Sequence, residues 1–224
     1  MIDKSTMNLA VLMDFLKDTN IDKGTEYPWL GSAFYFGYLA ATPIQSWFIQ
    51  KLPLAKYLST MVILWGIVLT CHVACSNFSK FVAVRFFLGL CEAPIYPSVT
   101  LLTGRFYTRH EQVSRVVCWY SMNGLAFILG GAAAYGILIH PPSVLNMWKE
   151  LFLIFGVITI AFGIISLYAK VKVLSCFLPS SPESVYYLTP RERKVAVLQV
   201  ASNQTGIRDT HFSWKQLHEA FKGT

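Results

Sequence analysis

Charged residues are scarce in this sequence, and long stretches have none. Asp, Glu, Lys and Arg make up 14% of the 224 residues, and hydrophobic residues make up 54%, whereas a typical soluble domain is about one quarter charged. Four stretches contain no charged residue: 29–49, 57–79, 116–139 and 151–169. Each is close to the roughly 20 residues with which an α-helix crosses a bilayer. Because buried helices of soluble proteins are usually shorter, this pattern argues against a soluble protein.

The polar–apolar alternation of a membrane β-barrel strand is also missing, since apolar residues follow one another without interruption. The sequence therefore predicts an all-α membrane protein. Its transmembrane bundle covers residues 1–174, and residues 175–224 form a polar cytoplasmic loop with short amphipathic helices. The expected spans are a partial first helix at about 1–16, followed by 29–49, 57–78, 80–103, 116–139 and 148–169.

Motifs of enzymes and metal sites are lacking. The sequence holds no HExxH, no GxSxG and no P-loop, so a membrane-embedded enzyme is not favoured. Cys71 and Cys75 flank His72, but no further ligand stands at a suitable spacing for a metal site. We interpret the five cysteines as free thiols and predict no metal, no cofactor and no enzymatic activity.

The formal net charge of +7 is explained by the membrane topology and does not indicate a nucleic-acid-binding surface. Lys and Arg collect on every second connection: Lys51 and Lys56 occupy 50–56 without an acid, and three arginines accompany Glu111 in 105–115. Cytoplasmic loops carry such an excess of positive charge. The pattern predicts a multi-pass protein in contact with the lipid bilayer, with 17–28, 77–80 and 140–149 outside and the tail in the cytoplasm. No nucleic-acid partner is predicted.

Two charges interrupt the apolar stretch 81–104, and they are the strongest functional candidates. Arg85 and Glu92 stand seven residues apart, which places them on nearly one face of a helix, ~10 Å apart along its axis. A charge at this depth costs at least about 2.5 kcal/mol on insertion scales and normally faces a cavity. The alternative is a structural ion pair with another helix. Pro94 and Pro97 follow at once and predict a kink.

The stretch 116–139 combines small residues with one amide. Ala126, Gly130 and Ala134 recur at every fourth position, the spacing that lets two membrane helices approach closely, so a packing role is predicted for them. Asn123 precedes them on the same helix. Its side chain is a candidate either for hydrogen bonding to a ligand or for bonding to a neighbouring helix.

Several runs resemble one known family. The run from Arg85 to Pro94, Arg-Phe-Phe-Leu-Gly-Leu-Cys-Glu-Ala-Pro, and the basic segment 105–115 resemble the fourth span and following loop of the major facilitator superfamily. More narrowly, they are similar to the anion:cation symporter branch and its fungal allantoate permease family. Residues 3–8 resemble that family's first span, 27–39 its second, and 178–182 its exit from the sixth. The resemblance covers almost the whole chain.

The resemblance implies a six-helix amino-terminal bundle with a truncated first helix, whose partner, a carboxy-terminal six-helix half, is missing from the sequence. It also implies proton-driven uptake of small organic anions, such as allantoate, other ureides or nicotinate-like acids, across the plasma membrane by alternating access. An alternative is a non-transporting remnant or an accessory membrane subunit of the same family. We expect the chain alone to enter the membrane without concentrating a substrate.

The resemblance implies a role for each of several individual residues. Asp3 and Glu92 are implied as proton carriers, and Lys4 and Arg85 as partners of the anion. Tyr38, in the second span, and Asn123 complete the expected substrate-binding set. The chemistry is consistent, because an acid beside a cation releases its proton readily, and a substrate that pairs with the cation raises the acid's affinity for a proton. One cavity shared by both charges is therefore expected to couple the two fluxes.

Overall fold

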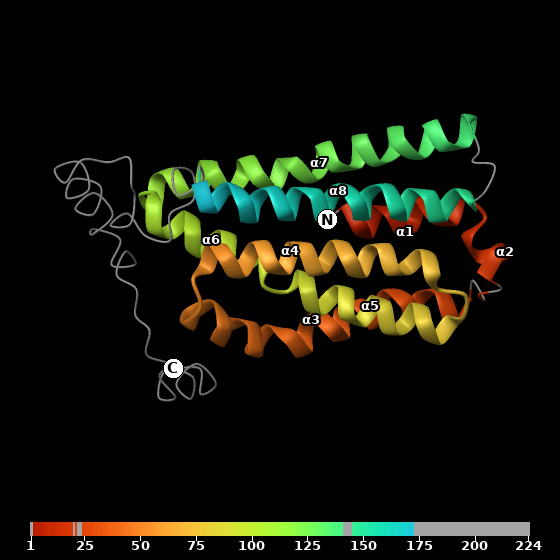
Figure 1. Cartoon of the computed structure of the whole chain (residues 1–224), viewed down its shortest axis with the longest axis horizontal. Helices are drawn as coiled ribbons and strands as arrows, with labels where there is room; N and C mark the ends of the chain where they lie inside the picture. The colour runs from red at the N-terminus through yellow and green to blue at the C-terminus, as the bar shows by residue number, and fades with distance from the viewer. Residues whose placement is uncertain (1, 20, 22–23, 141–144, 173–224) are drawn as a thin grey trace.

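The computed structural model describes residues 2–19, 21, 24–140 and 145–172, and within these ranges all regular structure is helical (Figure 1). The all-α prediction is confirmed. The tail predicted for 175–224 lies outside the described residues. The elements are α1 (Ile2–Leu12), α2 (Phe15–Thr19), α3 (Glu26–Lys51), α4 (Leu54–Cys71), the short 3-10 helix η1 (His72–Ala74), α5 (Phe78–Glu92), α6 (Ile95–Phe106), α7 (Arg109–Ile139) and α8 (Met147–Lys172).

Four helical segments of the described chain are long and apolar enough to cross a membrane. They are Lys56–Ala74, Phe78–Gly104, His110–Ile139 and Met147–Tyr168. The 26-residue helix α3 also has the length for a crossing. These helices lie side by side in the bundle and alternate in direction (Figure 1). The described residues of the three connections that the charge pattern places outside lie at the end of the bundle marked by α2 (Figure 1).

The segment Phe78–Gly104 is divided in its middle. Helix α5 ends at Glu92 and α6 begins at Ile95, because Pro94 has no N–H for the α-helical ladder and its ring crowds the preceding turn. Pro97 lies in the first turn of α6, where a missing N–H costs little. The interruption predicted from the two prolines is therefore present, and it leaves Glu92 at the break.

Glycines set the closest contacts between helices. A Cβ built on Gly37 of α3 would stand 2.0 Å from the carbonyl oxygen of Phe86, and one on Gly89 of α5 would stand 2.1 Å from that of Phe34. Backbone therefore touches backbone where α3 crosses α5. Helices α4 and α8 meet in the same way, with Gly66 and Gly156 at the contact. Such small residues are the usual means by which membrane helices pack tightly.

Replacing Gly37 with alanine is expected to destabilise the bundle. The added methyl group would overlap the backbone of α5, which cannot move like a side chain, so a cost of about 1–3 kcal/mol or more is expected. Thermal unfolding of the purified protein in detergent measures the change. Gly124→Ala on α7 is the matched control, because a Cβ there meets nothing within 4 Å among the described residues. Equal melting temperatures for the two variants would contradict the close approach.

The small-residue stripe of α7, formed by Ala126, Gly130 and Ala134, packs less tightly than predicted. Gly130 and Ala134 are buried, and α7 contacts α1, but a Cβ on Gly130 would stand 3.6 Å from the Leu9 side chain, which is ordinary contact. Within the described chain, a Cβ on Gly131 or Gly136 meets nothing within 4 Å. The stripe therefore contacts side chains of α1 and does not mark a contact between two backbones.

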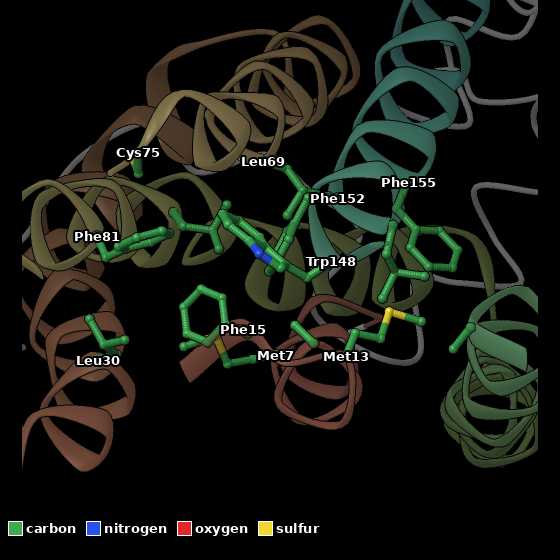
Figure 2. Close-up of a cluster of buried hydrophobic side chains, with 14 of the residues drawn as sticks. Met7, Met13, Phe15, Leu30, Leu69, Cys75, Phe81, Trp148, Phe152 and Phe155 are labelled. Carbon is green, nitrogen blue, oxygen red and sulfur yellow. The ribbon is translucent and has the colours of Figure 1, made fainter. Parts of the chain in front are cut away.

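An aromatic cluster fixes the end of the bundle near α2 (Figure 2). Phe15 of α2 meets Phe81 of α5 and Trp148 of α8 edge to face, with ring centroids 5.2 and 5.1 Å apart. All three side chains are fully buried. Edge-to-face pairs of this kind add about 0.5–1.5 kcal/mol to the gain from burial. The short helix α2 is thereby joined to two of the long helices.

The Asp18 carboxylate connects two segments of the chain at the same end of the bundle. It accepts hydrogen bonds from Asn146 Nδ2 at 2.6 Å and from the Trp148 indole Nε1 at 3.1 Å. These bonds join the first connection of the chain to the start of α8. Two connections predicted on one side of the membrane are therefore in direct contact.

Asp18→Ala is expected to lower the melting temperature of the protein. Hydrogen bonds to a charged group contribute about 1.5–3 kcal/mol, and the buried Trp148 N–H would lose its acceptor. The control is Asp14→Asn, which removes the exposed 2.6 Å ion pair with Lys17. Asn tolerates the positive φ of 60° found at this position, and exposed ion pairs contribute about 0–1 kcal/mol. A larger loss for the control than for Asp18→Ala would contradict this assignment.

Candidate functional site

Arg85 and Glu92 of α5 are both buried within the segment long enough to span the membrane. Arg85 is 4% exposed and Glu92 is 2% exposed. They line two different cavities, of about 240 Å³ and about 310 Å³ respectively. The expectation of a single shared cavity is therefore wrong. The Arg85 cavity is bounded by α1 and α3, whereas the Glu92 cavity is bounded by α4, α6, α7 and α8.

The Arg85 cavity lies between α1, α3 and α5. The Arg85 guanidinium Nη2 donates to Met7 Sδ at 2.9 Å, and the Arg85 Cζ lies 5.9 Å from the centroid of the Phe152 ring. A thioether carries no charge and is a weak acceptor. The remaining wall is largely aromatic and apolar. The described residues that line it are Met7, Asn8, Tyr27, Pro28, Leu30, Gly31, Phe34, Tyr35 and Arg85.

A hydrogen bond connects α1 and α3, the two helices that line this cavity together with Arg85. Tyr27 Oη of α3 donates to Asn8 Oδ1 of α1 at 3.0 Å. A buried guanidinium that faces a small cavity is suited to an anionic group, because it offers two parallel N–H donors to a carboxylate. The arrangement is therefore chemically suited to a small organic acid.

A histidine lies behind Arg85. The imidazole of His72 is fully buried and stacks on the Phe152 ring, with centroids 4.9 Å apart and planes at 3°. Its Nδ1 lies 3.2 Å from the Val68 carbonyl oxygen. The ring that carries this stack also contacts the Arg85 guanidinium. His72 was not singled out for this role by its sequence context, because a stacking partner 80 positions away leaves no local pattern.

The Glu92 cavity lies between α4, α6, α7 and α8. Asn123 lines it together with Glu92, so the structure brings these two predicted site residues together. Tyr96 of α6 belongs to the same lining. The described residues that line it are Trp65, Leu69, Glu92, Ile95, Tyr96, Val99, Trp119, Met122, Asn123, Ala126, Phe155, Ile158 and Thr159.

Of the other predicted residues, only Tyr38 has a side chain that the structure describes. Tyr38 is half-buried and lines neither of the two cavities. Asp3 and Lys4 lie in α1, one turn before Met7, but their side chains are outside what the structure describes. No group of three or more His, Cys, Asp or Glu suited to a metal ion occurs in the described part of the chain.

Comparison with known proteins adds a family. A model described as Major Facilitator Superfamily matches residues 1–222. The chain is 34% identical to the allantoate permease of Saccharomyces cerevisiae over 99% of its own length, and 32% identical to the thiamine pathway transporter of the same yeast over 98%. It is 29% identical to that yeast's high affinity cysteine transporter over 99%. The chain spans about 40% of the length of each of these relatives.

Proposed function

The chain belongs to the Major Facilitator Superfamily, and we propose that it forms the amino-terminal bundle of a proton-coupled symporter for small organic anions. Its relatives are fungal transporters, and its apolar helices make it a multi-pass membrane protein. In the proposed protein, a second six-helix bundle corresponds to the part of the relatives beyond the matched region. Transport then follows from rocking of the two bundles about a site between them.

The observation that carries the proposal is the pair of buried charges on one helix. Arg85 supplies positive charge to a cavity of organic-acid size, and Glu92 supplies a carboxylate that can hold a proton in the middle of the same segment. Charges at this depth cost several kcal/mol and are generally retained for ion or substrate pathways. Lys4 and Asp3 of α1 are proposed as the second anion partner and second proton carrier, with Asn123 and Tyr38 as substrate contacts.

Coupling between the two charges acts along α5 rather than within one cavity. Seven residues of helix separate them by ~10 Å, and at an effective dielectric constant of about 20 two unit charges at that distance interact by about 1–2 kcal/mol. An anion that neutralises Arg85 removes this interaction. The affinity of Glu92 for a proton then rises by roughly tenfold, so anion and proton are loaded together.

The proposed substrates are small carboxylates, such as allantoate, other ureides or nicotinate-like acids. A guanidinium favours the carboxylate through paired hydrogen bonds. The aromatic walls contributed by Tyr27, Phe34 and Tyr35 favour a planar or apolar remainder. The proposed location is the plasma membrane. The distribution of Lys and Arg over the connections supports a tail in the cytoplasm.

Uptake into a transporter-deficient host tests the proposal. We would express a chimera in which residues 1–224 replace the matching part of the yeast allantoate permease, and measure uptake of radiolabelled allantoate and nicotinate. Accumulation that exceeds the empty vector and disappears with a protonophore is expected. The intact permease shows that the assay works, and residues 1–224 alone are expected to accumulate nothing. Accumulation by the chimera that persists with the protonophore would contradict proton coupling.

A further inference from the structure

The Glu92 cavity has a different chemical character from the Arg85 cavity. Among the described residues that line it, Glu92 is the only one charged at neutral pH. Among these described residues, a carboxylate ligand would therefore meet a negative charge and no positive one. The electrostatics favour a cationic or neutral ligand over an organic anion.

Two indole N–H groups on opposite walls point to a ligand as well. Trp65 Nε1 of α4 and Trp119 Nε1 of α7 are both buried, and neither has a hydrogen-bond partner among the described residues. Both tryptophans line the cavity. An indole N–H is a donor only, and leaving such a donor buried without an acceptor is unfavourable, so nearly all are satisfied in folded proteins. An acceptor atom inside the cavity would satisfy both donors.

The walls are suited to a flat positive group. Trp65, Tyr96, Trp119 and Phe155 contribute aromatic surface, and the Trp119 ring stacks on Tyr96 with centroids 6.2 Å apart and planes at 29°. Aromatic faces attract cations, most strongly where water is excluded. The volume of about 310 Å³ lies at the small end of ligand pockets, which limits the occupant to a molecule about the size of one substituted ring.

We propose that the cavity lined by Trp65, Trp119 and Glu92 binds a small organic cation that carries a hydrogen-bond acceptor, such as a pyridinium carboxamide. Its positive charge lies against the Glu92 carboxylate and the aromatic faces. Its acceptor oxygen receives the indole N–H of Trp65 or Trp119. This site goes beyond the proposed anion transport, in which Arg85 binds the anionic group and Asn123 is the substrate contact proposed from this cavity's lining.

Binding of three matched probes to the purified 224-residue protein in lipid nanodiscs tests this site by calorimetry. 1-Methylnicotinamide carries both the charge and the carbonyl acceptor, nicotinamide lacks the charge, and 1-methylpyridinium lacks the carbonyl. 1-Methylnicotinamide is expected to bind at least about fivefold more tightly than either of the others. Equal affinity for the three probes, or binding of none, would overturn the proposal without the use of any variant.

Variants assign the contacts. Trp65→Phe and Trp119→Phe keep an aromatic ring and remove the N–H. At least one of them is expected to weaken 1-methylnicotinamide about 3- to 10-fold and to leave 1-methylpyridinium unchanged. Glu92→Gln is expected to remove the preference for 1-methylnicotinamide over nicotinamide.

Trp29→Phe is the control, because Trp29 is 58% exposed and lines neither cavity. If the tryptophan variants weakened the acceptor-free probe equally, their effect would be one of packing, and the hydrogen-bonding role would be wrong. The outcome is independent of the anion proposal, because anion uptake by the chimera can succeed or fail whatever these probes do.

Discussion

Glu92→Gln is expected to abolish proton-driven accumulation of substrate while exchange of substrate across the membrane continues. Glutamine has nearly the shape of a protonated glutamate, but it cannot release a proton, so the coupled step is lost and the binding site is kept. In the chimera, accumulation is expected to fall at least about tenfold, to the level reached without a pH gradient, because the carboxylate that the gradient acts on is gone. Uptake at several external pH values, together with counterflow in preloaded vesicles, measures the two activities separately.

The matched control is Glu111→Gln at the start of α7. The Glu111 carboxylate accepts hydrogen bonds from the Thr108 backbone N–H and hydroxyl at 3.0 and 2.9 Å, and glutamine can take the same position in a capping box. Unchanged accumulation is expected for this variant. If Glu92→Gln kept the pH dependence of the unaltered chimera, Glu92 would have a structural role only.

Arg85→Gln is expected to have the second large effect, on the affinity for the anion. Removing one partner of a buried charge-assisted pair costs about 2–5 kcal/mol, so the KM for uptake is expected to rise at least about 30-fold. Arg85→Lys retains the charge without the planar fork of donors, and an intermediate increase of about tenfold is expected. The dependence of initial uptake rate on substrate concentration gives both values.

Arg115→Gln is the control for charge alone. Arg115 is exposed on α7 and lies over the Tyr107 ring, with its Cζ 4.8 Å from the centroid, away from the lining of both cavities. The KM of the Arg115→Gln variant is expected to match that of the unaltered chimera. A fall in the amount of Arg85→Gln protein in the membrane, with no change in KM, would assign Arg85 to stability rather than to the anion.

Local sequence patterns predicted the helices and the break in one of them. A charge-free stretch of about 20 residues specifies a membrane helix by its length alone, and Pro94 specifies an interruption by its missing N–H. The burial of Arg85 and Glu92 could be expected for the same kind of reason, since a charge inside an apolar stretch must be shielded from lipid. These inferences need no knowledge of neighbouring helices.

Features that depend on the partner of each helix were beyond the sequence. The seven-residue spacing places Arg85 and Glu92 on nearly one face, but it does not state which helices line a cavity at each level, and the lining helices differ. Asp18 bonds to Trp148, 130 positions away, and Gly37 is distinguished from Gly131 only by the backbone that touches it. The two indole donors gave no signal either, because tryptophan is common in membrane helices.

The most direct test of the central claim is whether protons enter with the anion. Proteoliposomes that contain the chimera and an internal pH dye, with the membrane voltage clamped and no initial pH gradient, would receive allantoate from outside. Acidification of the interior is expected on addition of allantoate, and none is expected with Glu92→Gln. Entry of radiolabelled allantoate into the same vesicles with no acidification would show that anion movement is not coupled to protons, and would contradict the roles proposed for Arg85 and Glu92.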